Sequence, residues 1–316
     1  MVKKIKLITY MRKNEYFNEG IEDVCNIING ITDSLECVVF TDSHREFVEK
    51  KFKINNIISS GTKYSRLLKL INEEDEDCLY ISVDNDMIFN QKVFKKYIAD
   101  CLSRNVDFSW ARLQSQKCNG VISKLVAIDK LLSHNIIRPV IWRLGLGLSI
   151  PGQCFVLNPK AFKNKLYKID TFLDDLALGA FVNENYSALN VYTSKDIIGY
   201  EYPNSNFWKL CKQRKRWAKG FYQVLNASKG KEIFGKVCFH GLVYHCNWII
   251  NWLIVILLVL LNVKIAGVYI LLVALIITYR EPQMLFWGVI YQFIFPIFHV
   301  VWIYYLIKGE NNLDNG

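Results

Sequence analysis

Three long apolar runs near the end of the 316-residue chain constrain its fold more than any other feature. They cover residues 242–261, 265–279 and 284–307. A helix that crosses a bilayer needs about 20 predominantly apolar residues, and the first and third runs supply that length. The second run is shorter and follows the first after three residues, so these two are typical of a tight hairpin or a re-entrant element. We therefore expect about three transmembrane helices over residues 241–308.

Three residues inside the third run, one proline and two polar residues, refine this expectation. Pro296 should kink the helix, because proline removes a backbone donor and crowds the preceding turn. Gln292 and His299 should face protein or water rather than lipid, since polar groups are costly in a hydrocarbon environment. The last residues, 309–316, form a polar tail.

The net charge of +10 is concentrated in one segment. Residues 203–236 hold nine lysines and arginines against a single acid, Glu232, and they include Trp208 and Trp217. A basic, aromatic segment beside a membrane span favours the cytoplasmic face of the plasma membrane, where the anionic headgroups of membrane lipid attract it. We therefore expect residues 203–240 to form a basic amphipathic interfacial segment, and we expect no nucleic-acid partner. Nine cysteines without a CxxC pair are typical of a reducing compartment.

The first 202 residues alternate short apolar strands with amphipathic helices. Strands are predicted at residues 5–10, 37–41, 78–83, 106–112 and 153–158, and helices at residues 21–28, at 64–71 and from Asp174 onward. This alternation predicts an α/β domain with a largely parallel sheet covered on both faces. Ligands of such sheets bind at the carboxyl ends of the strands.

Asp84 and Asp86 come directly after the strand predicted at residues 78–83. Two carboxylates at a strand end can hold a hard divalent cation, which would neutralise a diphosphate. A D-x-D pair alone is a weak signal, because acidic loop residues are usually solvated.

A second acidic pair, Asp174 and Asp175, opens a predicted helix. Acidic residues in a first turn are stabilised by the helix dipole, and this alone would account for the pair. A carboxylate beside a sugar donor could also act as a general base.

A third motif, QRKRW, places Gln213, Arg216 and Trp217 on one face of a helix. Its plain interpretation is an interfacial basic helix. In the functional interpretation, Arg216 stabilises charge on a leaving diphosphate and Trp217 stacks on an acceptor sugar ring.

An early aspartate, D-x-D, D-D and then QRKRW before membrane spans resemble the family-2 glycosyltransferases. The resemblance is strongest to their membrane-bound cellulose-synthase-like and hyaluronan-synthase-like branch. It implies a GT-A nucleotide-sugar-binding domain, with a Rossmann-like mixed sheet, over residues 1–202. The interfacial segment 203–240, the transmembrane region 241–308 and the polar tail 309–316 would follow.

The resemblance also implies roles for individual residues. Asp42 would contact the nucleobase, and Lys63 would lie near the nucleotide. Asp84 and Asp86 would bind the donor diphosphate and a Mg or Mn ion, with Asp86 as the more direct ligand. In addition, Gln213 and Arg216 would complete the donor site.

The remaining implied roles concern catalysis and the acceptor. Asp175 would be the catalytic base, and Asp174 stands where the family commonly has glutamate. Gly152 would lie beside the acceptor path, and Trp217 would contact the acceptor.

The activity implied is inverting transfer from a UDP-sugar to a growing polysaccharide or cell-envelope glycan. Single-sugar transfer to a lipid acceptor is the alternative, and a non-catalytic membrane subunit that binds a nucleotide-sugar is a further one. Three spans are few for a polymer pore, so polymer export would need a homo-oligomer or an export partner. Metal-dependent phosphoryl transfer can also use D-x-D, but it does not require the later two motifs.

Overall fold

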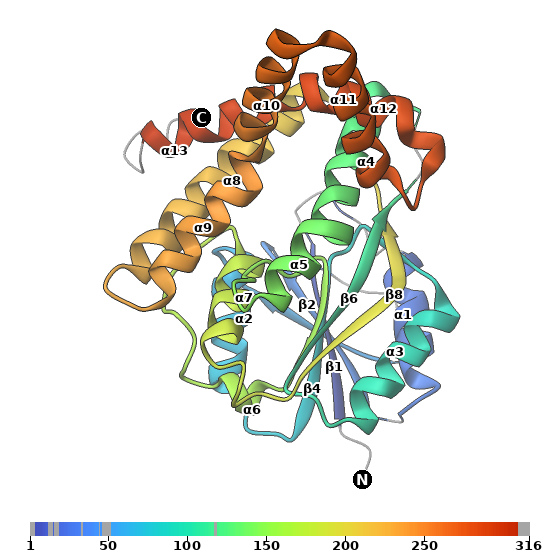
Figure 1. Cartoon of the computed structure of the whole chain (residues 1–316). Coiled ribbons are helices and arrows are strands. Elements are labelled where there is room, and N and C mark those ends of the chain that lie inside the picture. The colour runs from blue at the N-terminus through green and yellow to red at the C-terminus, as the bar shows by residue number, and fades with distance from the viewer. Residues whose placement is uncertain are drawn as a thin grey trace. The chain divides into compact units, whose positions relative to one another are not determined.

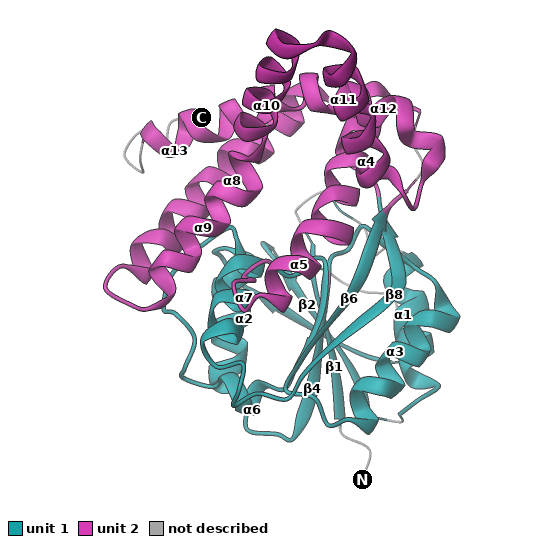
Figure 2. Cartoon of the chain, viewed as in Figure 1, with its two compact units in different colours: residues 1–114, 150–201 teal, residues 115–149, 202–316 magenta. Residues whose placement is uncertain are grey.

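The chain divides into two compact units (Figure 2). The structure, a computed structural model, describes residues 4–11, 15, 19–32, 34–43, 45, 52–116 and 119–308. Unit 1 comprises residues 1–114 and 150–201, and unit 2 comprises residues 115–149 and 202–316. The second stretch of unit 2 begins at Tyr202, close to the predicted end of the first domain, whereas residues 115–149 also belong to unit 2. The predicted polar tail lies outside the described residues.

Unit 1 is built on an eight-stranded sheet in the order β3-β2-β1-β4-β7-β6-β8-β5 (Figure 1). The strands are β1 (Lys4–Met11), β2 (Leu35–Thr41), β3 (Lys53–Ile58), β4 (Cys78–Val83), β5 (Met87–Phe89), β6 (Phe108–Ser115), β7 (Cys154–Leu157) and β8 (Val191–Glu201). β1 pairs in parallel with β2 and β4, and β2 with β3. β7 pairs antiparallel with β4 and β6, and β5 with β8. The sheet is therefore mixed, and the expectation of a largely parallel sheet holds only for its first half.

Helices cover both faces of this sheet (Figure 1). α1 (Glu19–Asn29) and α3 (Gln91–Ser103) cover one face, and α2 (Lys63–Glu73), α6 (Pro159–Phe162) and α7 (Asp174–Glu184) cover the other. Side chains alternate along β1, so Leu7 belongs to the core shared with Val24 of α1 and Phe94 of α3. Further along β1 the ring of Tyr10 stacks on Phe40 of β2, with 5.4 Å between the ring centroids.

Unit 2 is helical. Its helices are α4 (Val121–Leu132), the π-helix η1 (Ser133–Ile137), α5 (Arg138–Arg143), α8 (Phe207–Ser228), α9 (Ile233–His245), α10 (Asn247–Leu261), α11 (Val263–Thr278), the 3-10 helix η2 (Pro282–Met284), α12 (Leu285–Ile294) and α13 (Pro296–Lys308). The buried core of this unit joins Ile128 of α4, Leu210 of α8, Ile277 of α11 and Phe298 of α13. Residues 115–149 thus supply core side chains to a unit whose other helices come much later in the chain.

One helical segment among the described residues, Pro282–Lys308, is by itself long and apolar enough to cross a bilayer. The run predicted at residues 242–261 is not one straight helix, because α9 and α10 are bent by 50° where they meet at Cys246. Taken together as one broken span, α9 and α10 would make a second crossing. α11 has 16 residues and is shorter than a spanning helix. Three spans therefore remain a prediction.

A hydrogen-bond network joins the apolar helices α10, α11 and α12. Gln292 is 5% exposed, and its amide donates to the carbonyl of Ile270 at 3.0 Å. The indole of Trp252 donates to the carbonyl of Gln292 at 2.8 Å, and the hydroxyl of Tyr269 donates to Asn251 at 3.0 Å. Polar side chains in apolar helices are typically paired across helices in this way.

The two polar residues of the third apolar run lie against protein, which is one of the two surroundings predicted for them. Gln292 and His299 are both buried against protein, which confirms the expectation for each. Pro296 begins α13, and the α-helix is interrupted at Phe295 between α12 and α13. The kink at Pro296 stays a prediction.

Glu74, at the end of α2, makes the stability of unit 1 depend on pH. Burial raises the pKa of this carboxyl, but hydrogen bonds from Lys6 and Tyr80, each 2.5 Å long, outweigh it and lower the pKa from its ordinary 4.5 to about 2. The ionised carboxylate therefore stabilises the fold above about pH 4.5, and this contribution is lost as the pH falls towards 2.

We predict that Glu74→Gln lowers the free energy of unfolding by about 2 kcal/mol at pH 7, because two hydrogen bonds to a charged group are weakened. Urea unfolding of both proteins between pH 7 and pH 3 should show the difference shrinking below pH 4.5. A difference that stays constant over this range would show that the carboxylate charge contributes nothing.

Candidate active site

An ion-pair cluster lies in unit 1 around the ammonium group of Lys63, the first residue of α2. Its Nζ donates to Asp84, which follows β4, at 2.8 Å, and to the carbonyl of Gly152, which precedes β7, at 2.5 Å. The carboxylate of Asp174, the first residue of α7, lies 3.3 Å away. The side chains of Lys63 and Asp174 are 18% and 13% exposed, and that of Asp84 is 35% exposed. One cation thus joins two helix starts and two strand ends.

The start of α2 is held in place by its own hydrogen bonds. Thr62 caps the helix, because its hydroxyl accepts from the amide of Ser65. The same hydroxyl donates to the carboxylate of Asp170 at 2.6 Å. Gly61, just before the cap, has a φ of +101°, which glycine adopts without strain. These contacts direct Lys63 towards the end of β4.

Electrostatics keep this lysine charged. Burial alone would lower the pKa of Lys63, but the carboxylates of Asp174 and Asp84 outweigh it and raise the pKa above its ordinary value. Burial is also the largest effect on Asp174 and raises its pKa, while the charge of Lys63 opposes that rise. Lys63 therefore stays protonated at neutral pH.

Gly152 allows the first turn of α7 to approach the strand end closely. A Cβ atom at this position would lie 3.1 Å from the Cβ of Asp175 and 3.7 Å from a carboxylate oxygen of Asp174. Asp175 is half-buried, and its carboxylate accepts from the amide of Leu176 at 2.9 Å. Leu173 supplies no side-chain cap to α7, so the dipole interpretation of the acidic pair also fits the structure.

Asp86 is exposed, in the turn between β4 and β5. Although the residue is exposed, nearby protein atoms partly desolvate its carboxyl group, and this is the main cause that raises its pKa; the negative charges of Asp84 and Glu201 add to the rise. Glu201 is paired with Met87 across β5 and β8, so this acid approaches the D-x-D turn from a distant part of the chain. No local motif pointed to Glu201, because its place beside the turn depends on strand pairing.

A divalent cation is compatible with this turn if the donor supplies further ligands. Among the described residues no three His, Cys, Asp or Glu side chains form a ready-made metal site. Mg²⁺ is commonly held by one or two carboxylates together with substrate phosphates and water. Asp86, with Asp84 beside it, matches that donor set.

Asp42 follows β2 and is exposed. The guanidinium of Arg66 in α2 donates to its carboxylate. Arg66 is three residues after Lys63, so both lie on the same face of α2. That spacing is the signal by which the sequence could have pointed to Arg66.

The QRKRW motif belongs to α8 in unit 2, which confirms that the motif is helical. Gln213 accepts from the side-chain amide of Asn204 at 3.0 Å, and Arg216 is exposed. The ring of Trp217 lies beneath the guanidinium of Arg214, with 4.4 Å to the ring centroid.

The buried arginine of the motif is Arg214, for which the sequence predicted no role. Its side chain is 3% exposed, and it donates to Asp129 of α4 at 3.0 Å. The hydroxyl of Tyr291 in α12 donates to the other oxygen of Asp129 at 2.9 Å. Arg214 therefore ties α8 to α4 and α12. The sequence did not predict this role, because Arg214 lies in a run of basic residues that are otherwise alike in charge.

The structure thus groups the predicted site residues by unit. In unit 1 the side chains or backbone of five of them meet in one cluster, which consists of Lys63, Asp84, Gly152, Asp174 and Asp175. Two other predicted residues of unit 1 lie near that cluster. One follows Asp84 by two residues in the sequence, and the other is paired with Arg66 of α2. They are Asp86 and Asp42. The three predicted residues of the QRKRW motif lie on α8 of unit 2.

Solved structures of three other proteins are similar to this chain. The mannosyltransferase PcManGT from Pyrobaculum calidifontis, solved with GDP-Man and Mn²⁺, matches with a TM-score of 0.53 and 12% identity over 98% of this chain and 87% of that one. TarS residues 1–349 from S. aureus match with a TM-score of 0.48 and 12% identity, over 97% of this chain and 92% of that one. Glucosyl-3-phosphoglycerate synthase from Mycobacterium tuberculosis matches with a TM-score of 0.47 and 12% identity, over 71% and 80%.

No protein-family model matches the chain, and no curated protein matches it in sequence. At 12% identity, the similarity to the mannosyltransferase is a similarity of fold alone. The chain has the GT-A fold. The predicted GT-A domain is therefore confirmed as a fold, while the cellulose-synthase-like and hyaluronan-synthase-like branch stays a prediction.

We predict that Lys63→Met lowers the free energy of unfolding by about 2 kcal/mol, because it leaves Asp84 and Asp174 without their cation. The loss is smaller than for a fully buried pair, since Asp84 is partly exposed. Lys69→Met, on the exposed side of the same helix, is the matched control. Equal losses in urea unfolding of the two variants would contradict a structural role for the Lys63 cluster.

For unit 2 we predict that Arg214→Met costs about 3 kcal/mol of unfolding free energy, because it leaves the carboxylate of Asp129 without its cation. Lys212→Met, on the exposed face of α8, should change stability by less than about 0.5 kcal/mol. Combining Arg214→Met with Asp129→Asn should cost less than the sum of the two single losses. Strict additivity in thermal unfolding would show that the two side chains do not interact.

Proposed function

We propose that the chain is a membrane-bound inverting glycosyltransferase that transfers a sugar from a UDP-sugar to a growing polysaccharide or cell-envelope glycan. The observation that carries this proposal is the Lys63 cluster, in which Asp84 and Asp174 meet at the carboxyl end of β4 on a GT-A fold. Sheets of this kind bind their ligands at that edge.

The donor roles follow from the chemistry of these groups. Asp42 would contact the nucleobase, and Lys63 would offer a positive charge to the diphosphate. Asp86, together with Asp84, would hold a Mg or Mn ion, which supplies charge neutralisation to the leaving nucleoside diphosphate. The mannosyltransferase of the same fold was solved with Mn²⁺ and GDP-Man, which supports a divalent cation here.

The transfer itself would be a single displacement at the anomeric carbon. Asp175 accepts the proton of the acceptor hydroxyl as its oxygen attacks, and the bond from the anomeric carbon to the diphosphate breaks. Asp174 is less suited to take this proton, because Lys63 lies beside its carboxylate. Inversion at the anomeric carbon follows from one displacement.

The QRKRW motif is proposed to take part in substrate binding. Gln213 and Arg216 would contact the donor, with Arg216 stabilising charge on the diphosphate. Trp217 would stack on the acceptor sugar, and Gly152 would line the acceptor path. Arg214 would act by positioning Trp217, over which its guanidinium lies.

The helices of unit 2 support a membrane location for this activity. α8 is rich in lysine and arginine, and α10 has no buried residue although its sequence is almost entirely apolar. We propose that the chain is an integral protein of the plasma membrane with its GT-A domain in the cytoplasm. Polymer export would require a homo-oligomer or an export partner.

A second candidate function is single-sugar transfer to a lipid acceptor, and an apolar pocket in unit 2 favours it. A non-catalytic subunit that binds a nucleotide-sugar is less well supported, since Asp84, Asp86, Asp175 and the QRKRW motif are all present.

The test is to incubate the purified full-length protein with Mn²⁺, a panel of radiolabelled UDP-sugars and a lipid extract, and then to measure UDP release and product size. Asp175→Asn should keep UDP binding and lose about 100-fold or more in transfer. Asp86→Ala should lose Mn²⁺-dependent UDP binding, whereas Glu73→Gln, an exposed acid on α2, should change neither. No UDP release from any UDP-sugar, with or without lipid, would overturn the proposal.

A further inference from the structure

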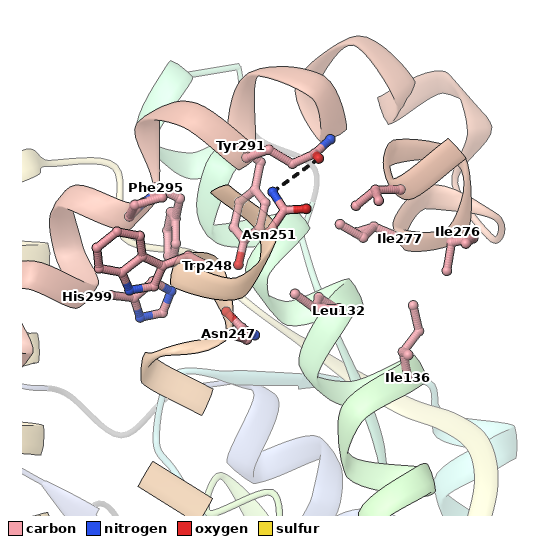
Figure 3. A pocket seen from close by; sticks show the side chains of 13 residues that line it. Leu132, Ile136, Asn247, Trp248, Asn251, Ile276, Ile277, Tyr291, Phe295 and His299 are labelled. Atoms are coloured by element: carbon pink, nitrogen blue, oxygen red, sulfur yellow. Dashed lines mark hydrogen bonds between the residues drawn. The ribbon is translucent and has the colours of Figure 1, made fainter. Parts of the chain in front are cut away.

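A pocket of about 220 Å³ lies within unit 2 (Figure 3). In the view of Figure 3, Trp248, Phe295 and His299 group on one side of it, and the aliphatic side chains of Leu132 and Ile136 lie on the other. Its walls come from α4, η1, α10, α11, α12 and α13, so segments far apart in the sequence build it.

Two of the three amide side chains in this wall, those of Asn251 and Gln292, are hydrogen-bonded within the protein. Asn251 donates to Gln292 at 3.5 Å, the contact drawn in Figure 3, and accepts from Tyr269 at 3.0 Å. Gln292 in turn donates to two backbone carbonyls, and the hydroxyl of Tyr291 donates to Asp129. Because these polar groups are paired, the pocket offers a ligand mainly apolar surface.

Size and polarity restrict what the pocket can hold. Sites for drug-sized molecules measure about 300–1,000 Å³, so this pocket is too small for a nucleotide-sugar. Apolar cavities of about 150 Å³ stay dry and bind hydrocarbons. The volume and the apolar lining of the pocket therefore fit one segment of a single hydrocarbon chain.

Part of the pocket wall belongs to an exposed apolar surface. Ile276 lines the pocket and is 59% exposed. On the same helix hairpin, Leu253 and Leu257 of α10 and Leu272 of α11 are between 52% and 61% exposed. An apolar surface of this extent marks contact with a membrane or another protein. A hydrocarbon chain could thus enter from a bilayer that covers α10 and α11.

A chain of contacts connects the pocket to the predicted acceptor residue Trp217. Tyr291 and Phe295 line the pocket, and Tyr291 is bonded to Asp129, which pairs with Arg214. The guanidinium of Arg214 lies over Trp217 at 4.4 Å and over Phe295 at 5.3 Å, each measured to the ring centroid. All of these residues belong to unit 2.

We propose that this pocket holds the hydrocarbon chain of a lipid-linked acceptor, whose polar end extends towards Trp217. The inference rests on the proposed sugar transfer and assigns its acceptor to the second candidate, a lipid. A bulk bilayer lipid is not the intended occupant, since the contacts that lead from the pocket end at the QRKRW motif.

The test uses a diazirine-bearing analogue of farnesyl phosphate as a photoactivatable probe, with the full-length protein in phosphatidylcholine nanodiscs. Mass spectrometry should place the label on residues 247–251, 273–277 and 291–299. Unlabelled farnesyl phosphate should suppress labelling, and additional phosphatidylcholine should not. Equal competition by phosphatidylcholine would mean that the pocket takes any bilayer chain, which would overturn the proposal.

Cavity-filling variants make the test specific. Val273→Phe and Ile136→Phe fill the pocket from different helices, and each should lower labelling about tenfold, the loss expected when about two methylene groups lose their buried site. Leu275→Phe, on the exposed side of α11, is the matched control and should label as the wild type does. Thermal unfolding identifies any variant that has not folded. Wild-type labelling in both folded cavity-filling variants would overturn the proposal.

The two proposals fail in different ways. Pocket labelling as expected in a wild-type protein that releases UDP from no UDP-sugar would overturn the proposed function. Sugar transfer to a lipid that proceeds with unchanged KM for that lipid in folded Val273→Phe and Ile136→Phe would overturn the pocket assignment alone.

Discussion

The ion pairs of Lys63 organise the part of unit 1 on which the proposed chemistry depends. A buried ammonium group is costly unless carboxylates and carbonyls compensate for its lost hydration. Asp84, Asp174 and the carbonyl of Gly152 do so, and each comes from a different element. The requirement to satisfy one cation therefore fixes the starts of α2 and α7 against the end of β4. Asp175, the proposed base, is positioned next to this cluster as a consequence.

In unit 2, too, buried polar groups are paired with partners in the protein, here in more apolar surroundings. Arg214 is paired with Asp129, and Asn251 and Gln292 are bonded to each other, so their polar groups find protein partners. Each contact joins helices that are distant in the sequence. These links leave the outer faces of α10 and α11 apolar, and they shape the apolar pocket between the helices.

The sequence predicted elements whose signal is local. β4 and the start of α7 were placed correctly, because a continuous apolar run and an acidic first turn mark them. β3 was not predicted, because its residues are half-exposed and include two asparagines. The break at Cys246 and the pairing of Arg214 with Asp129, 85 residues away, depend on tertiary contacts that no local pattern encodes. The candidate site was therefore predicted as a set of acids and motif residues, but not as a cluster centred on Lys63.

The most direct test of this account is a crystal structure of the protein with UDP and Mn²⁺, in which anomalous scattering locates the metal. We expect the ion on the carboxylate of Asp86 and the UDP diphosphate, with Lys63 within hydrogen-bond distance of Asp84 or of the diphosphate. Manganese and UDP bound at a position remote from Asp84, Asp86 and Lys63 would contradict it.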